Sequence, residues 1–163
     1  MQWRLMEEKD LPGVIRAADA IHAAYPEDDA VFIERLRLYP GGCHVLATDG
    51  DIAGYMLSHP WRFGEPPALN SPLSELPRSA TTYYIHDIAL LPEGQGRGHA
   101  VEAVERAIAQ ARHEGIGNVS LVAVNNSGAF WARRGFEEFS SPALAAKLES
   151  YGADAKFMTR RLD

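Results

Sequence analysis

The sequence has one cysteine and no long apolar run, and each scarcity excludes a class of protein. A single cysteine, Cys43, allows neither a disulfide within the chain nor a cysteine-rich zinc site. No apolar segment approaches the roughly 20 residues that span a bilayer. Charged residues follow Met1 too early for a signal peptide. We therefore expect a cytoplasmic protein with no membrane partner, and we interpret Cys43 as a small apolar residue at the start of a strand.

Basic residues are also scarce, since 16 Lys and Arg face 22 Asp and Glu and the net charge is −6. This balance argues against a protein that coats nucleic acid, because phosphate neutralisation needs a basic face. The six histidines show no spacing typical of metal ligands, so we expect no metal. The 163 residues, 46% hydrophobic and 23% charged, are typical of one globular domain over 1–163.

The apolar pattern predicts strands and helices in an α/β order, with hairpins first and a strand–helix–strand unit later. Strands are expected at 1–6, 43–48, 52–58, 81–91, 119–124 and 156–162. Helices are expected after Asp10, from Asp28 or Asp29 to Leu38, from 99 to a glycine end at 115 or 117, and after Asn126 or Ser127. The stretch 59–80 holds five prolines and is expected to be a loop over an active site.

A glycine-rich turn at 92–98 lies between the expected strand 81–91 and the following helix. The N–H groups at a helix N-terminus are unsatisfied and attract a phosphate, and glycines let that ligand approach the backbone. No lysine follows these glycines, so the turn is not a Walker loop, and the G-x-G-x-x-G dinucleotide spacing also fails. The residues from Gln95 to Ala100 instead read Q-x-x-G-x-A.

This hexapeptide resembles the acetyl-coenzyme A signature [QR]-x-x-G-x-[GA] of the GCN5-related N-acetyltransferase (GNAT) superfamily. The stretch 88–93 is similar to that family's strand before the loop, and 126–136 to its later aromatic helix and Gly-Phe turn. The resemblance implies a mixed, mostly antiparallel central sheet flanked by helices, with strands splayed at the acetyl-CoA site. It also implies transfer of an acetyl group from acetyl-CoA to an amine of a small molecule or peptide by direct, base-assisted attack.

The resemblance further implies a set of coenzyme-binding residues. The pyrophosphate is expected on N–H groups of the glycine turn, and the pantetheine along the strand before it, as an added strand would lie. Arg97, Arg133 and Arg134 are candidates for the phosphates, although a solvated arginine is the commoner outcome. For Asn125 and Asn126, helix capping is an equal alternative. The full set is Ile88, Ala89, Leu90, Gln95, Gly96, Arg97, Gly98, His99, Ala100, Asn125, Asn126 and Phe130.

The candidate general base lies on the strand before the turn, as the resemblance implies. The period of two places Tyr84, His86 and Ile88 on one face, and Asp87 on the other. His86 is the better base, because an imidazole has an ordinary pKa near 6.5. Tyr84 and His86 fall on positions where arylalkylamine acetyltransferases of this superfamily carry imidazoles. Asp87 would need a raised pKa. The alternatives are a core histidine bonded to the backbone for His86 and, for Asp87, a structural role as partner of a neighbouring arginine or of a loop N–H group.

The general acid is less well defined, because Trp131 stands where many family members have a tyrosine. An indole N–H donates a hydrogen bond but has no accessible acidity. Ser127 and Tyr84 are the other candidate donors, and Trp131 would otherwise pack under the coenzyme. This departure leaves a second hypothesis open, a non-catalytic acyl-CoA-binding sensor. Separately, the protein could form a homodimer instead of a monomer.

The acceptor pocket is expected beside the thioester, under the loop 59–80. Trp61 and Phe63 would supply apolar walls, and the helix 28–38 would form the opposite side. The acidic net charge mildly favours a cationic acceptor by steering.

Overall fold

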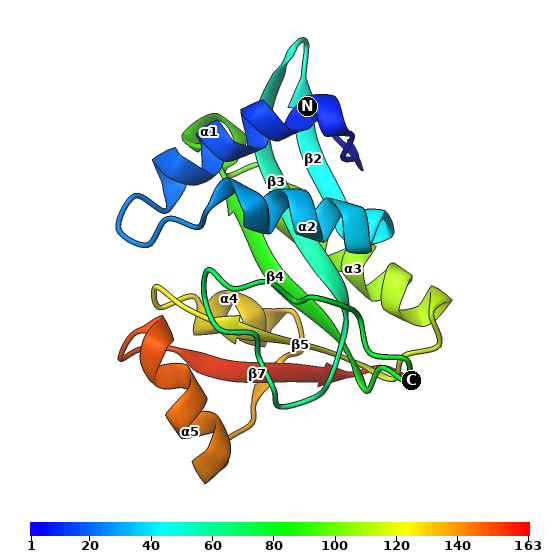
Figure 1. The fold of residues 1–163 in the computed structure, drawn as a ribbon, viewed down its shortest axis with the longest axis vertical. Coiled ribbons are helices and arrows are strands. Elements are labelled where there is room, and N and C mark those ends of the chain that lie inside the picture. The colour runs from blue at the N-terminus through cyan, green and yellow to red at the C-terminus, as the bar shows by residue number, and fades with distance from the viewer.

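A computed structural model describes residues 1–163 and arranges them around one seven-stranded sheet (Figure 1). The strand order is β1-β2-β3-β4-β5-β7-β6, and only β4 and β5 run parallel to each other. This mixed, mostly antiparallel sheet confirms the expected fold class. The strands are β1 (Gln2–Leu5), β2 (Cys43–Thr48), β3 (Asp51–Trp61), β4 (Thr82–Leu90), β5 (Asn118–Ala123), β6 (Glu137–Glu138) and β7 (Lys156–Arg161).

Helices cover both faces of the sheet and divide the core into two main parts. One part packs α1 and α2 against residues such as Val45 and Tyr55, and the other packs α3 and Trp131 of α4 against residues such as Met56 and Tyr83. In Figure 1, α1 and α2 cross the front of the sheet while α3 lies behind it. The helices are α1 (Leu11–Ile21), α2 (Asp29–Leu38), α3 (His99–His113), α4 (Gly128–Arg133) and α5 (Pro142–Leu148).

Three elements differ from the sequence expectation, and one is the short strand β6, which was not expected and pairs with β7. The strand β3 continues beyond Ser58 to Trp61, through Pro60. Pairing with β2 ends at Leu57, so Pro60 occupies an edge position where its missing N–H costs no ladder bond. The helix α5 was not expected, although its start follows a common pattern, since the Ser141 hydroxyl accepts a bond from the N–H of Leu144 and proline occupies the first helical position.

The loop 62–81 is fixed to α2 by buried charges. The Glu34 carboxylate accepts hydrogen bonds from the backbone N–H groups of Leu73 and Ser74, and the buried Arg35 guanidinium donates to the carbonyl of Ser71 and to Glu34. The segment 71–74 of this long loop therefore has both N–H and C=O partners on one helix, which holds the loop across the front of the sheet.

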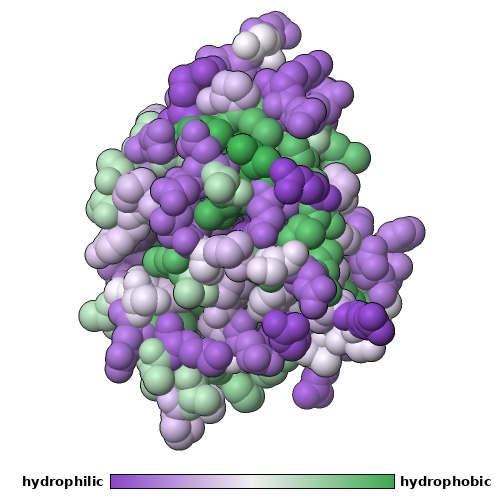
Figure 2. Space-filling model, viewed as in Figure 1, coloured by the Kyte–Doolittle hydropathy of each residue, from purple (hydrophilic) through white to green (hydrophobic).

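The outer face in front of α1 and α2 is mostly hydrophilic, with smaller apolar areas between the polar residues (Figure 2).

Cys43 is fully buried at the start of β2, as expected, and burial raises the pKa of its thiol to about 12. No helix combines the length and the apolar character that crossing a bilayer requires.

Candidate active site

The strands β4 and β5 separate halfway along the sheet. Their parallel pairing covers only Tyr83–Ile85 of β4 opposite Val119–Leu121 of β5, while β4 itself continues to Leu90 and β5 to Ala123. The expected splay is therefore present, and it starts at His86. Backbone groups of β4 beyond this residue have no β5 partner on that side, which leaves an edge to which an extended ligand can add.

A β-bulge lies at the start of this gap. Leu57 of β3 pairs with Asp87 and Ser58 pairs with Ile85, so His86 has no partner across the ladder. The bulge turns both His86 and Asp87 toward α1 and α2, because both side chains bond residues on that side. The prediction that His86 and Asp87 occupy opposite faces is thus wrong, because the bulge adds one residue to the period of two.

His86 forms a buried pair with Glu27, which lies in the connection between α1 and α2. The His86 Nε2 to Glu27 Oε1 distance is 2.9 Å, and the two side chains are 3% and 12% exposed. Burial by itself raises the pKa of Glu27, but the hydrogen bond and charge of His86 outweigh it and lower that pKa to about 2. An ionised Glu27 can only accept, so Nε2 carries the hydrogen, and the buried Nδ1 bonds no protein group.

The Glu27–His86 pair predicts a pH-dependent contribution to stability. A carboxyl with a folded pKa of about 2 and an ordinary pKa of 4.5 stabilises the fold above pH 4.5, and this contribution is lost as the pH falls toward 2. The free energy of unfolding of the wild type should therefore exceed that of Glu27→Gln by an amount that shrinks over this range. Urea denaturation at several pH values measures it, and a difference that does not change with pH would contradict the assignment.

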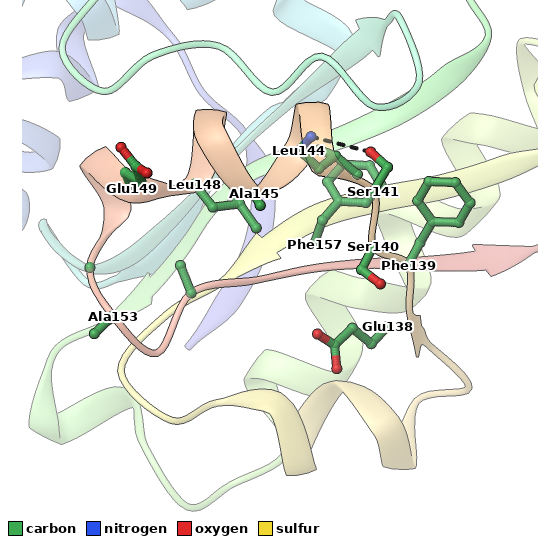
Figure 3. A pocket seen from close by; sticks show the side chains of 12 residues that line it. Glu138, Phe139, Ser140, Ser141, Leu144, Ala145, Leu148, Glu149, Ala153 and Phe157 are labelled. Carbon is green, nitrogen blue, oxygen red and sulfur yellow. Dashed lines mark hydrogen bonds between the residues drawn. The ribbon is translucent and has the colours of Figure 1, made fainter.

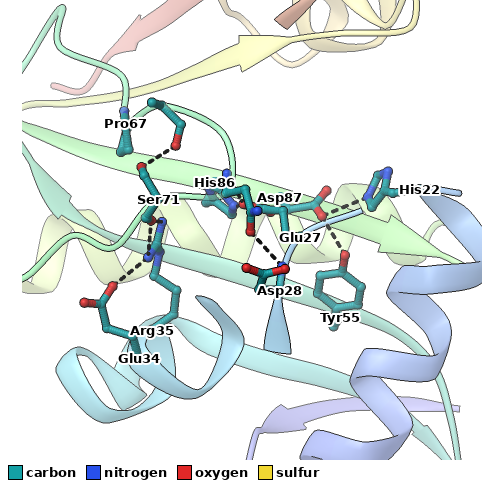
Figure 4. A network of polar contacts seen from close by, with 12 residues as sticks. His22, Glu27, Asp28, Glu34, Arg35, Tyr55, Pro67, Ser71, His86 and Asp87 are labelled. Atoms are coloured by element: carbon teal, nitrogen blue, oxygen red, sulfur yellow. Dashed lines mark hydrogen bonds and ion pairs between the residues drawn. The ribbon is translucent and has the colours of Figure 1, made fainter. Parts of the chain in front are cut away.

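Asp87 belongs to a second polar group next to the first (Figure 4). Its Oδ2 accepts a hydrogen bond from the Tyr55 hydroxyl at 2.6 Å and lies 2.9 Å from His22 Nε2. The hydrogen bond to Asp87 raises the pKa of His22, although burial partly opposes this. Burial and the Asp87 charge raise the pKa of Tyr55 well above its ordinary value. The expected alternative for Asp87, an arginine or loop N–H partner, is wrong, because its partners are a tyrosine and a histidine.

Two tyrosines complete the site. Tyr84 lies on β4 with its side chain fully buried, and Tyr151 lies in a 3-10 turn at Glu149–Tyr151. The Tyr151 hydroxyl donates to the carbonyl oxygen of Pro67 in the loop 62–81. Burial raises the pKa of Tyr151 to about 12, so its phenol stays protonated near neutral pH.

These groups surround a cavity of about 90 Å³ at the point where β4 and β5 part. Its walls come from the α1–α2 connection, β4, β5, the loop 62–81 and the turn that holds Tyr151. The lining residues are His22, Tyr25, Glu27, Leu69, Tyr84, His86, Asp87, Val122, Val124 and Tyr151. Sequence reasoning missed Glu27, His22 and Tyr151 because no local pattern links them to β4.

The loop 62–81 does border the cavity, but not through the expected aromatic residues. Leu69 lines it, and the backbone N–H of Asn70 donates to Glu27 Oε2. Trp61 is instead buried at the end of β3 against Leu73 and Tyr84, while Phe63 packs on the far strand β7. The helix α2 contributes no wall, because the connection before it, with Tyr25 and Glu27, takes that place.

The glycine turn follows β4 and leads directly into α3. Gly96 and Gly98 have φ angles of 77° and 81°, the left-handed region that glycine adopts without strain. The backbone N–H groups of residues 96–101 donate to no acceptor in the protein. The turn is held from both sides, since the Trp3 indole donates to the carbonyl of His99 and the Gln95 amide donates to the carbonyl of Leu90. The result is a preformed cradle for an anion at a helix N-terminus.

The candidate residues of α4 and of the turn before it lie outside the lining of the cavity. Trp131 is buried in the core, where its ring meets Phe130 and Phe136 edge to face, and it does not line the cavity. Ser127 precedes α4 without a side-chain cap bond. Asn125 and Asn126 form an exposed turn with φ angles of 54° and 57°, and the N–H of Asn126 donates to Asp154.

The three candidate arginines lie at the surface or near it. Arg97 and Arg133 are exposed, and the Arg134 guanidinium lies 5.7 Å from the centre of the half-buried Phe130 ring. No group of three or more His, Cys, Asp or Glu side chains is placed to hold a metal ion.

A larger cavity of about 490 Å³ lies between α5 and β7 (Figure 3). Its walls are mainly apolar, including Phe139, Leu144, Leu148 and Phe157. Neither a histidine nor the glycine turn borders it, and its titratable groups are two glutamates at its margin, Glu138 and Glu149. The larger cavity therefore lacks the histidines and tyrosines that line the smaller cavity at the splay.

Comparison with known proteins agrees with this geometry. The model of the acetyltransferase (GNAT) family matches residues 8–136, which is most of the chain. The chain therefore belongs to the acetyltransferase (GNAT) family. No curated protein sequence matches it.

Solved structures share the whole fold at low identity. Ard1 from Thermoplasma volcanium has a TM-score of 0.74 and 17% identity, with 99% of this chain and 97% of that chain covered. The ribosomal-protein-S18-alanine N-acetyltransferase from Escherichia coli has a TM-score of 0.68 and 17% identity, with 99% and 94% covered. GphF, a GNAT-like decarboxylase in complex with isobutyryl-CoA, has a TM-score of 0.79 and 16% identity, with both chains fully covered.

Proposed function

We propose that this protein transfers an acetyl group from acetyl-CoA to an amine of a small molecule or peptide. The observation that carries the proposal is that two features lie one after the other along β4 and the turn that follows it. A run of backbone N–H groups without acceptors follows the strand, and a buried imidazole with a free Nδ1 lies at its bulge. The first suits a pyrophosphate and the second suits proton removal.

The coenzyme would lie along the splayed edge of β4. The turn 96–101 would bind its pyrophosphate through backbone N–H groups, and the pantetheine would pair with Ile88–Leu90. The thioester would then reach the cavity at the bulge. Family membership supports this arrangement, as does the isobutyryl-CoA bound by GphF, which shares the fold.

His86 would act as the general base of a direct transfer. Nδ1 takes a proton from the amine, and the nitrogen lone pair attacks the thioester carbonyl carbon. The carbon–sulfur bond then breaks, and the thiolate leaves. Glu27 holds Nε2–H, so it fixes the tautomer with a basic Nδ1 and stabilises the imidazolium that forms. A thiolate with an ordinary thiol pKa near 8.5 can recover the proton from an imidazolium.

Tyr84 is the better placed of the three candidate donors to the leaving thiolate. It lines the same cavity as His86, whereas Trp131 is packed in the core and Ser127 lies before α4. Burial raises the pKa of Tyr84 well above its ordinary value, so its contribution would be a hydrogen bond and not a transferred proton.

The packing of Trp131, in the position of the family's usual tyrosine acid, favours a second candidate function, a non-catalytic acyl-CoA sensor. A panel of amines separates the two. Release of free thiol from acetyl-CoA should rise in the presence of at least one primary amine. Coenzyme binding measured by calorimetry, with no amine stimulating thiol release, would favour the sensor.

A further inference from the structure

The two carboxylates in the cavity differ in how much of their bonding capacity the protein uses. Glu27 employs both oxygens, since Oε1 meets His86 Nε2 and Oε2 accepts from the N–H of Asn70. Asp87 employs one, because the Tyr55 hydroxyl and His22 both meet Oδ2 while Oδ1 bonds no protein group. In Figure 4 both dashed lines reach the same oxygen of Asp87. Asp87 is therefore the carboxylate of the cavity lining that has an oxygen without a protein partner.

The free atom of Asp87 has a free neighbour. His86 lines the same cavity with a side chain that is only 3% exposed, and its Nδ1 has no partner. The bulge turns these consecutive side chains to one face, so a carboxylate oxygen and a ring nitrogen that bond no protein group belong to neighbouring residues of one small cavity. A primary ammonium group, with three N–H donors, is complementary to such a pair of acceptors.

The rest of the lining constrains what the amine can carry. No lysine or arginine lines the cavity, and its two imidazoles, His22 and His86, are already paired with Asp87 and Glu27. A carboxylate on the carbon next to the amine would therefore enter beside these two acidic residues without a free cation to pair with. The volume of about 90 Å³ is small, so the amino group and the carbon next to it would fill the cavity. The body of the acceptor would lie against Tyr25, which is 67% exposed, and Leu69.

We propose that Asp87 Oδ1 binds the ammonium group of the acceptor, and that the acceptor is a primary amine with an apolar body and no carboxylate next to the nitrogen. This assignment rests on the proposed acetyltransferase function. One N–H of the ammonium donates to Asp87 Oδ1, and another proton moves to His86 Nδ1. The neutral amine so formed attacks the thioester. Asp87 thereby determines specificity while His86 does the proton transfer.

Matched pairs of amines test the proposal. Phenethylamine and L-phenylalanine differ only in the carboxylate, as do 3-methylbutylamine and L-leucine. The wild type should use each amine with a kcat/KM at least about 100-fold above that of its amino acid, because an unpaired buried charge costs several kcal/mol. Equal use of amine and amino acid would overturn the proposal, and this comparison needs no variant.

Asp87→Asn adds a second test, with Asp28→Asn as the matched control, because Asp28 is an exposed neighbour of Glu27 outside the cavity lining. Asp87→Asn should raise the KM for phenethylamine about 10- to 100-fold with kcat changed far less, the range that losing a hydrogen bond between charged groups implies. Coenzyme affinity should stay the same in both variants. A fall in kcat at unchanged KM would overturn the binding role.

Binding measured without turnover separates this proposal from the one on which it rests. Calorimetry of phenethylamine with the CoA-loaded protein should show binding that Asp87→Asn weakens and Asp28→Asn does not. If the amine binds in this way but no acetyl group is transferred, the ammonium site holds and the acetyltransferase function fails. If acetyl transfer occurs and Asp87→Asn leaves amine binding intact, the ammonium site is wrong and the function holds. If phenethylamine binds neither the wild type nor the Asp28→Asn control, the ammonium site is also wrong.

Discussion

Gly98→Glu should abolish coenzyme A binding. The backbone at Gly98 has a φ angle of 81°, and a Cβ placed there would meet no protein atom within 4 Å, so the new side chain would project into the space above the free N–H groups. Its negative charge would compete with the pyrophosphate. The loss of only two hydrogen bonds to a charged group, at about 1.5 kcal/mol each, weakens binding about 100-fold. Isothermal titration calorimetry with coenzyme A measures this effect.

The chain offers a matched control at the other end of the same helix. Gly115 has a φ angle of 71°, and a Cβ there also meets nothing within 4 Å. Gly115→Glu therefore introduces the same charge and similar backbone strain, but beyond the C-terminus of α3. It should bind coenzyme A like the wild type. Equal affinity of Gly98→Glu and Gly115→Glu would show that the turn is not the pyrophosphate site.

His86→Ala should lower kcat by about 100- to 10,000-fold at neutral pH, the range that general bases contribute. Coenzyme affinity should be nearly unchanged, because His86 lies at the bulge of β4 and not in the turn. The defect should shrink at high pH, where the free amine is abundant without a base. Steady-state kinetics across pH measures both effects, with His113→Ala, an exposed histidine at the end of α3, as control.

Glu27→Gln refines the same assignment. The amide keeps the shape of Glu27 but removes the charge that stabilises an imidazolium, so kcat should fall between the wild type and His86→Ala. If His86→Ala keeps near-normal turnover while Tyr84→Phe or Asp87→Asn loses it, the base is the residue whose substitution abolishes turnover.

The sequence predicts the glycine turn and the strands well because their causes are local. Free N–H groups at the start of α3 and left-handed glycines follow from residues adjacent in the chain. The splay of β4 from β5 is a family property, so it came with the resemblance. The length of β3 was underestimated because Pro60 reads as a break, and only the sheet order places it on an edge.

The inner site is less predictable because its causes are distant in sequence. The bulge at His86 depends on how β3 pairs with β4, which the alternation of one strand does not contain. Glu27 lies 59 residues before His86, and His22 lies 65 before Asp87, so only the folded chain joins them. The core position of Trp131 likewise depends on its packing with Phe136 and α3.

The two hydrogen bonds of the Glu27 carboxylate limit which sequence changes the site can tolerate in evolution. One oxygen of the carboxylate holds the loop 62–81 through Asn70, and the other holds His86. An insertion or deletion that moved Asn70 would therefore disturb the position of His86 along with the loop. Tyr25 and Leu69, whose side chains make no hydrogen bonds, are free of that constraint. Substitutions of these two side chains would thus reshape the cavity without breaking the bonds of Glu27, whereas a change in loop length would alter the Glu27–His86 pair as well.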